Sequence, residues 1–205
     1  MHLPINPDSI KGFLAPEEGE ALYALTLETA PVGPALEIGS YCGKSTVYLA
    51  AAAARADGLV YAVDHHQGSE EHQPGEEYHD PALYRAEDGV MDSFAEFRRT
   101  LRRAGLEGYV VPIVAPSGRA ARYWHTPLGL VFIDGGHSEE AAHTDYRAWA
   151  PWVAPGGVLA IHDIFPDPAD GGQAPYNIYR LALASGLFEE LPMVGTLGRL
   201  RRLVP

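Results

Sequence analysis

The chain has 205 residues, 46% of them hydrophobic and 20% charged, which fits one globular domain over residues 1–205. A formal net charge of -12, without any run of lysine and arginine, disfavours nucleic acid and anionic membranes as partners. The lone Cys42 excludes an intramolecular disulfide, and the chain shows neither a signal-like start nor an apolar run of membrane length. We therefore expect a cytoplasmic protein that binds small molecules.

Helical and strand patterns alternate along the chain. The first half predicts a helix, a strand, a glycine turn, a helix and a strand, at residues 16–30, 35–38, 39–43, 45–56 and 59–64. The second half predicts a helix, two strands, a helix, a strand and a helix, at residues 91–105, 109–114, 128–133, 140–153, 158–161 and 176–187. A turn at 155–157 precedes the last of these strands, and the segment after 187 fits neither pattern. This alternation predicts an α/β fold with a doubly wound, mostly parallel sheet.

Residues 65–92 interrupt the alternation. They contain four histidines, many acids, Pro74 and Gly75, with little apolar periodicity. A loop of this length in a compact domain is usually a functional lid or disordered, so we expect a lid here. The spacing of its histidines matches no recognisable metal-ligand pattern.

The first strand ends in a glycine turn of the form E-x-G-x-x-x-G, made by Glu37, Gly39 and Gly43. It lacks the glycines of a dinucleotide-binding turn, and Ile38 stands where a phosphate-binding P-loop needs glycine. An acid beside the turn opposes a phosphate and suits a cation. S-adenosylmethionine carries an ammonium and a sulfonium group, so its amino-acid end fits this turn better than a nucleotide phosphate does.

Acidic and imidazole side chains follow three further strands. Asp64 ends the second strand, where a carboxylate can accept hydrogen bonds from both ribose hydroxyls or, alternatively, begin a turn. Asp134, His162 and Asp163 follow two central strands, so they emerge at one edge of the sheet and could bind a cation together. The alternative is that His162 and Asp163 only hydrogen-bond to the following loop. His137 could take a proton from a substrate hydroxyl or cap the next helix.

Two segments resemble methyltransferase motifs. Residues 36–47, LEIGSYCGKSTV, resemble the first motif of the catechol O-methyltransferase group. Residues 132–164, FIDGGHSEEAAHTDYRAWAPWVAPGGVLAIHDI, are similar to the pattern of class I methyltransferases of the family 24 type. The order and spacing of the motifs cover roughly residues 17–165. The resemblance implies a Rossmann-like, seven-stranded sheet of order 3-2-1-4-5-7-6 and S-adenosylmethionine as the methyl donor.

The resemblance also implies roles for individual residues. The donor would contact Glu37, Gly39, Ser40, Tyr41 and Gly43 with its methionine end, Asp64 with its ribose and Ser117 near its adenine, with Asp134 also beside it. In the metal-dependent members the ligand positions fall on Asp134, His162 and Asp163, and His137 matches a catalytic lysine. Catechol-type enzymes have Asp-Asn where this chain has His-Asp, and an imidazole ligand weakens the preference for Mg²⁺ relative to Mn²⁺, Fe²⁺ or Zn²⁺.

These patterns predict methyl transfer from S-adenosylmethionine to a hydroxyl of a small molecule, assisted by a divalent metal. His162 would be either a metal ligand or the general base, since a metal-bound nitrogen cannot also accept a proton, and we favour the ligand. His137 would then take the proton. The alternatives are another transferase on this fold, such as an aminopropyl transferase, or a non-catalytic protein that binds S-adenosylmethionine or metal. The missing dinucleotide glycines disfavour an oxidoreductase, and a homodimer is left open.

Overall fold

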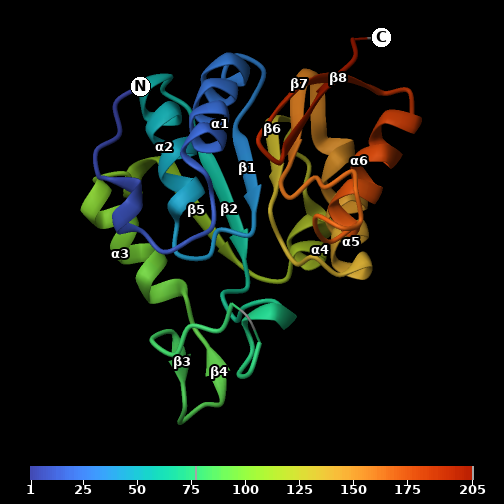
Figure 1. Ribbon diagram of the computed structural model, residues 1–205. Coiled ribbons are helices and arrows are strands. Elements are labelled where there is room, and N and C mark those ends of the chain that lie inside the picture. Colours follow the sequence, from blue (N-terminus) through green and yellow to red (C-terminus); the bar gives the residue numbers. More distant parts are fainter. Residues whose placement is uncertain (77, 205) are drawn as a thin grey trace.

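One sheet organises the molecule. The computed structural model describes residues 1–76 and 78–204, and within them seven strands form this sheet in the order β5-β2-β1-β6-β7-β9-β8 (Figure 1). The strands are β1 (Ala35–Ile38), β2 (Val60–Asp64), β5 (Val110–Val114), β6 (Leu128–Ile133), β7 (Val153–Ile161), β8 (Phe188–Val194) and β9 (Leu197–Arg202). Only β9 runs antiparallel to both of its neighbours among these strands. Numbered along the chain, the order is 3-2-1-4-5-7-6, which confirms the expected fold.

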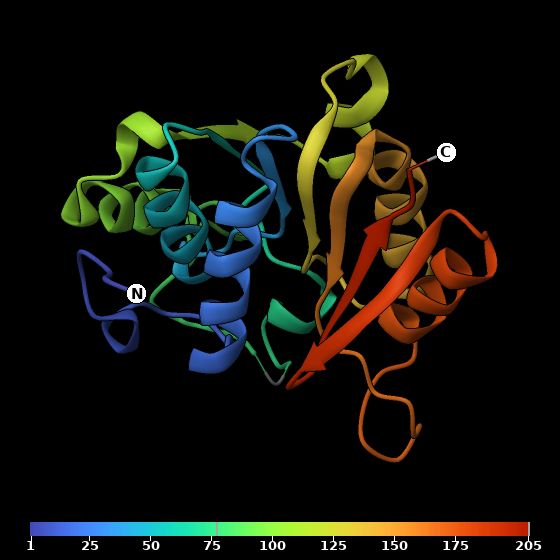
Figure 2. The same cartoon turned by 90° about the horizontal axis from the view of Figure 1, so that it is seen from above.

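Helices cover both faces of the sheet, as the view from above shows (Figure 2). One face carries α1 (Pro16–Thr29), α2 (Lys44–Arg55) and α3 (Phe94–Ala104), and the other carries α4 (Ser117–Ala120), α5 (Glu139–Trp149) and α6 (Ala174–Ala184). Successive strand residues point to opposite faces, so Phe132 packs toward α1–α3 and Val131 toward α5 and α6. Every residue of β6 is buried, as a central parallel strand between two helical layers requires.

The register of the central strands aligns their carboxyl ends. Ile38 pairs with Val63 on one side and with Ile133 on the other, and Ile133 pairs with Ile161. The residues that follow these strand ends therefore leave the sheet at the same edge. This alignment is the reason that the residues predicted from strand-end positions share one region.

Two parts of the chain differ from the sequence prediction. Pro155, Gly156 and Gly157 do not form a turn before the strand but lie inside β7, where the pairing with β6 shifts register between Leu128 and Leu130. Gly156 has a φ of +81°, which glycine adopts without strain. The unassigned C-terminal segment forms the β8–β9 hairpin.

Segment 65–92, for which the sequence predicts a lid and which we therefore call the predicted lid, has some regular structure of its own. It holds a 3₁₀ turn, η2 (Glu70–His72), and a short hairpin of β3 (Tyr84–Arg85) and β4 (Val90–Met91), which extends away from the main sheet (Figure 1). The next helix consequently begins at Phe94 rather than at Met91. Residue 77 of this segment, like residue 205, lies outside the described residues. None of the described helices is long and apolar enough to cross a membrane.

Phe132→Ala tests the packing that holds the central strands in place. Phe132 has no exposed surface, so we expect the cavity to lower the free energy of unfolding by about 3–5 kcal/mol, measured by urea denaturation. Tyr123→Ala is the control, because Tyr123 is 77% exposed and its truncation should cost less than about 0.5 kcal/mol. Equal losses in the two variants would contradict this description of the core.

Candidate functional site

A cavity of about 730 Å³ opens at the carboxyl edge of the sheet. Its walls come from the strand ends, from the N-terminal segment 11–14 and from residues 68–72 of the predicted lid. The sequence-predicted site residues that line it are Gly39, Ser40, Tyr41, Asp64, Ser117, Asp134, His137, His162 and Asp163. The other two, Glu37 and Gly43, are not among the residues that line the cavity. A cavity of this size is typical of small-molecule sites.

The glycine turn after β1 depends on close backbone contact. Gly39 has a φ of +87°, and a Cβ at this position would overlap the carbonyl oxygen of Asp134 at the end of β6. Only glycine both adopts this positive φ without strain and leaves room for that carbonyl oxygen. Gly43, with a φ of +90°, is the N-cap of α2, and its nearest neighbours lie in α3. The first glycine therefore brings the turn against Asp134, and the second begins the helix behind it.

Asp64 holds this turn from the end of β2. Its Oδ2 accepts hydrogen bonds from the backbone N–H groups of Ser40 (3.0 Å) and Tyr41 (2.8 Å), and its Oδ1 accepts one from His66 (2.7 Å). A carboxylate offers about four lone-pair positions, so these bonds leave room for about one more donor. The predicted contact with two ribose hydroxyls would therefore require a shared or displaced hydrogen bond.

Glu37 lies fully buried beneath the turn. Its Oε2 accepts a hydrogen bond from Thr46 Oγ1 (2.6 Å), whereas Oε1 has no partner among the described residues. Burial raises the pKa of this carboxyl to about 8. The group is therefore mostly neutral at pH 7, and the negative charge that the sequence suggested for the turn is largely absent there.

The far end of the cavity lies beside α4. Ser117 Oγ accepts a hydrogen bond from the indole Nε1 of the buried Trp149 (2.8 Å), so this hydroxyl is fixed in place. Asp145 also lines the cavity, and burial raises its pKa to about 6. The sequence analysis missed Asp145, because an acid within a helix gives no signal of its own burial.

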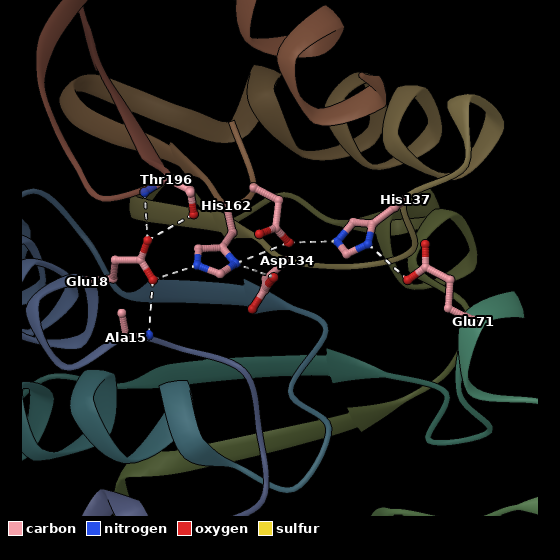
Figure 3. Close-up of polar contacts among 8 residues, drawn as sticks. Ala15, Glu18, Glu71, Asp134, His137, His162 and Thr196 are labelled. Atoms are coloured by element: carbon pink, nitrogen blue, oxygen red, sulfur yellow. Dashed lines mark hydrogen bonds and ion pairs between the residues drawn. The ribbon is translucent and has the colours of Figure 1, made fainter. Parts of the chain in front are cut away.

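Asp134, His162 and Asp163 converge at the ends of β6 and β7, and Figure 3 labels the first two. One ligand atom from each lies within 4.8 Å of the other two. His162 Nδ1 is 3.2 Å from Asp134 Oδ1 and 3.4 Å from Asp163 Oδ2. Both carboxylates are partly exposed to the cavity, whereas His162 is buried. The structure thus brings the predicted metal ligands together.

Glu18 of α1 lies on the opposite side of the same imidazole (Figure 3). Its Oε2 is 2.9 Å from His162 Nε2, and both side chains are buried. Although burial opposes it, the carboxylates of Asp134, Asp163 and Glu18 raise the pKa of His162 well above its ordinary value. Burial likewise opposes the shift at Glu18, but His162 and Thr196 lower its pKa to about 2.

A cation fits this set of donors. The negative charge of the carboxylates that favours a proton on His162 Nδ1 also attracts a metal ion, which would bind there by displacing that proton. Two carboxylates and one imidazole leave further coordination positions toward the cavity, as catalytic metal sites do. The alternative in which His162 and Asp163 only hydrogen-bond to their own loop does not describe these contacts.

His137 connects the cluster with the predicted lid. Its Nε2 is 3.1 Å from Asp163 Oδ2, and its Nδ1 is 3.1 Å from Glu71 Oε2 in η2 (Figure 3). The hydrogen bond with Asp163 is the main cause that raises the pKa of His137 to about 9. An imidazolium at neutral pH donates hydrogen bonds to both carboxylates, and this geometry gives little support to His137 as the proton acceptor.

Sequence reasoning missed Glu18 and Glu71. In the sequence, Glu18 is an ordinary acidic residue in the first turn of a helix. Its partner His162 lies 144 positions further along the chain. Glu71 reads as one of several acids in a polar loop. Neither position carries a local pattern, because each role depends on a contact that only the folded chain creates.

The pKa of Glu37 predicts a pH dependence of stability. Unfolding returns the pKa of the carboxyl to about 4.5, so between that pH and about 8 the folded protein holds a proton that the unfolded chain releases. The free energy of unfolding should therefore fall through this window as the pH rises. Glu37→Gln removes the ionisation, and urea denaturation at several pH values should show wild type losing stability relative to this variant. A constant difference between the two proteins would refute the raised pKa.

Comparison with known proteins agrees with the fold and the motifs. The O-methyltransferase NovP is 19% identical with a TM-score of 0.68, over 92% of this chain and 80% of that one. An O-methyltransferase from Bacillus cereus in complex with SAH is 18% identical with a TM-score of 0.62, over 93% and 83%. The O-methyltransferase TomG from Streptomyces achromogenes, in complex with SAM, is 16% identical with a TM-score of 0.59, over 94% and 82%.

At these identities the structures establish the fold. A family model described as a methyltransferase domain matches residues 36–164, well over half of the chain. The match includes the glycine turn, Asp64 and the cluster at the ends of β6 and β7. The chain therefore belongs to this methyltransferase family.

Proposed function

We propose that this protein transfers the methyl group of S-adenosylmethionine to a hydroxyl of a small molecule, with a divalent metal at Asp134, His162 and Asp163. The observation that carries the proposal is the convergence of these three side chains beside the glycine turn, on one cavity. Family membership supports methyl transfer, and the O-methyltransferases among the similar structures support a hydroxyl acceptor. A small acceptor suits the net charge of -12, and a cytoplasmic location suits the single cysteine.

The donor would lie along the ends of β1, β2 and β5. Gly39, Ser40 and Tyr41 form the wall for its methionine part, and Ser117 lies at the end where its adenine would sit. The Ser40 hydroxyl is buried without a partner among the described residues, so it has hydrogen-bonding capacity to spare. Glu37 supports the turn from beneath, and in its neutral state it would not attract the donor's charge.

The acceptor hydroxyl would lie over the ends of β6 and β7. Asp134, His162 and Asp163 would hold the divalent ion there, and its positive charge would lower the pKa of the hydroxyl. The new O–C bond forms in line with the breaking S–C bond, and the hydroxyl proton leaves to a base. The chain's own contribution is to hold donor and acceptor in this geometry.

His72 is the residue of the predicted lid best suited to accept that proton. It lines the cavity, and burial lowers its pKa, which favours the uncharged imidazole that a proton acceptor needs. Its Nδ1 is 2.8 Å from Ser69 Oγ, which orients the ring. His137 would instead remain charged between Asp163 and Glu71 and hold the predicted lid against the cluster.

The predicted lid would close over bound ligands and exclude water from the reaction. Two ion pairs among the described residues join it to the body of the protein: Glu71 pairs with His137, and Asp80 pairs with Lys11 of the N-terminal segment. Because these contacts are polar and partly exposed, they can open and re-form as ligands enter and leave.

Asp64→Ala tests the donor site. The variant loses the acceptor that holds the glycine turn, so we expect S-adenosylhomocysteine to bind more weakly by about 1–3 kcal/mol in titration calorimetry. Asp170→Ala is the matched control, since Asp170 is exposed and does not line the cavity. Unchanged affinity in Asp64→Ala would remove this residue from the donor site.

Asp163→Asn tests the metal. Asp163 has a φ of +57°, which asparagine tolerates better than alanine, so this substitution changes the ligand charge with little backbone strain. We expect Mn²⁺ affinity to fall by at least about tenfold, while S-adenosylhomocysteine still binds. The exposed Asp167→Asn, in the loop that follows β7, should behave as wild type.

Removal of metal should also stop the reaction. Product formation would be followed by mass spectrometry, with trideuteromethyl-labelled S-adenosylmethionine and a panel of small phenols and alcohols. EDTA should abolish transfer of the label, and Mg²⁺, Mn²⁺ or Zn²⁺ should restore it. Full turnover in EDTA, with no metal found by elemental analysis, would contradict the metal-assisted mechanism.

A further inference from the structure

We propose that Glu18 is a positioning residue that fixes His162 with Nδ1 directed toward Asp134 and Asp163, and thereby sets the affinity of the site for divalent ions. The proposal rests on the metal site of the proposed function. Glu18 lies in α1, outside the segment that the family model matches. The proposed role nevertheless connects it with the chemistry at the ends of β6 and β7.

The hydrogen bonds of Glu18 exclude it as a ligand. Its Oε1 accepts hydrogen bonds from Thr196 N (2.7 Å) and Thr196 Oγ1 (2.9 Å). Its Oε2 accepts one from Ala15 N (3.1 Å) and lies 2.9 Å from His162 Nε2 (Figure 3). These four donors occupy the roughly four lone-pair positions of a carboxylate. Glu18 can therefore orient His162 but has no acceptor position left for an ion.

The carboxylate is also fixed in space by the fold. Its partners come from the N-terminus of α1, the end of β7 and the turn between β8 and β9. At that turn Gly195 has a φ of +57°, and a Cβ there would lie 2.6 Å from Glu18 Oε1. Glu18 is only 3% exposed. The carboxylate cannot turn away from His162 without breaking hydrogen bonds to two other elements.

This anchoring decides which imidazole nitrogen faces the cavity. The ionised carboxylate of Glu18 can accept hydrogen bonds but cannot donate them. It therefore selects the form of His162 that carries a hydrogen on Nε2. Nδ1 then points to the gap between Asp134 and Asp163. A carboxylate that accepts a hydrogen bond from the other nitrogen of a metal-binding histidine fixes its tautomer and increases its basicity as a ligand. Glu18 is placed to act in this way.

Glu18→Gln tests the assignment by metal binding alone. An amide NH₂ cannot accept a hydrogen bond, so in either orientation it faces a backbone N–H, of Thr196 or of Ala15. When it faces His162, it favours hydrogen on Nδ1, the nitrogen needed for the ion. We expect Zn²⁺ and Mn²⁺ to bind about 10- to 100-fold more weakly than to wild type in titration calorimetry.

Glu28→Gln is the matched control. It makes the same substitution in the same helix, at a side chain that is 54% exposed and pairs with Arg201 rather than with the cluster. Its metal affinity should equal that of wild type. Equal affinity in Glu18→Gln would overturn the role of Glu18 and leave the metal site standing. If wild type binds neither ion, the metal site itself fails, and the proposal fails with it.

Nuclear magnetic resonance of wild type with ¹⁵N-labelled histidine keeps the test independent of whether Glu18→Gln folds. Zn²⁺ should shift Nδ1 of His162, while Nε2 keeps its hydrogen. Coordination through Nε2, or a hydrogen on Nδ1 in the Zn²⁺ complex, would overturn the proposal.

Discussion

The contact between Glu18 and His162 joins the parts of the protein that the site requires. It connects the first helix to the end of β7, and Thr196 extends the same contact to the C-terminal hairpin. Both side chains are buried, so neither charge has water to replace its partner. Loss of one partner would remove a buried charge pair that connects three elements, which is why the ends of the chain and the ligand cluster are expected to act as one unit.

The glycine turn and the ligand cluster also share a boundary. Gly39 lies against the backbone of Asp134, so the turn that faces the donor and the residue that faces the ion cannot move independently. Asp64 holds the other side of the turn through backbone N–H groups. In methyl transfer the two reacting atoms must meet in line, and a rigid boundary between their sites supplies that alignment.

The strand order was implied by the resemblance to methyltransferase motifs. The three clustered residues were predicted from the sequence itself, because strand-end positions follow from periodicity and parallel topology. The sequence did not predict the β8–β9 hairpin, whose exposed strand residues and internal Pro192 obscure a strand pattern. It also assigned charge from residue type alone. Burial makes Glu37 mostly neutral, and Asp163 and Glu71 keep His137 charged. Glu18 could not be found locally, since its partner is distant in the chain.

Pulsed electron paramagnetic resonance would test the placement of metal and donor most directly. The sample is the protein loaded with Mn²⁺ and with S-adenosylmethionine that carries a ¹³C-labelled methyl group. We expect coupling of Mn²⁺ to one imidazole nitrogen, and this coupling should disappear in His162→Asn. We also expect coupling of Mn²⁺ to the methyl carbon, because donor and ion would share one cavity. Bound Mn²⁺ that couples to neither the imidazole nitrogen nor the methyl carbon would contradict the placement of metal and donor at the ends of these strands.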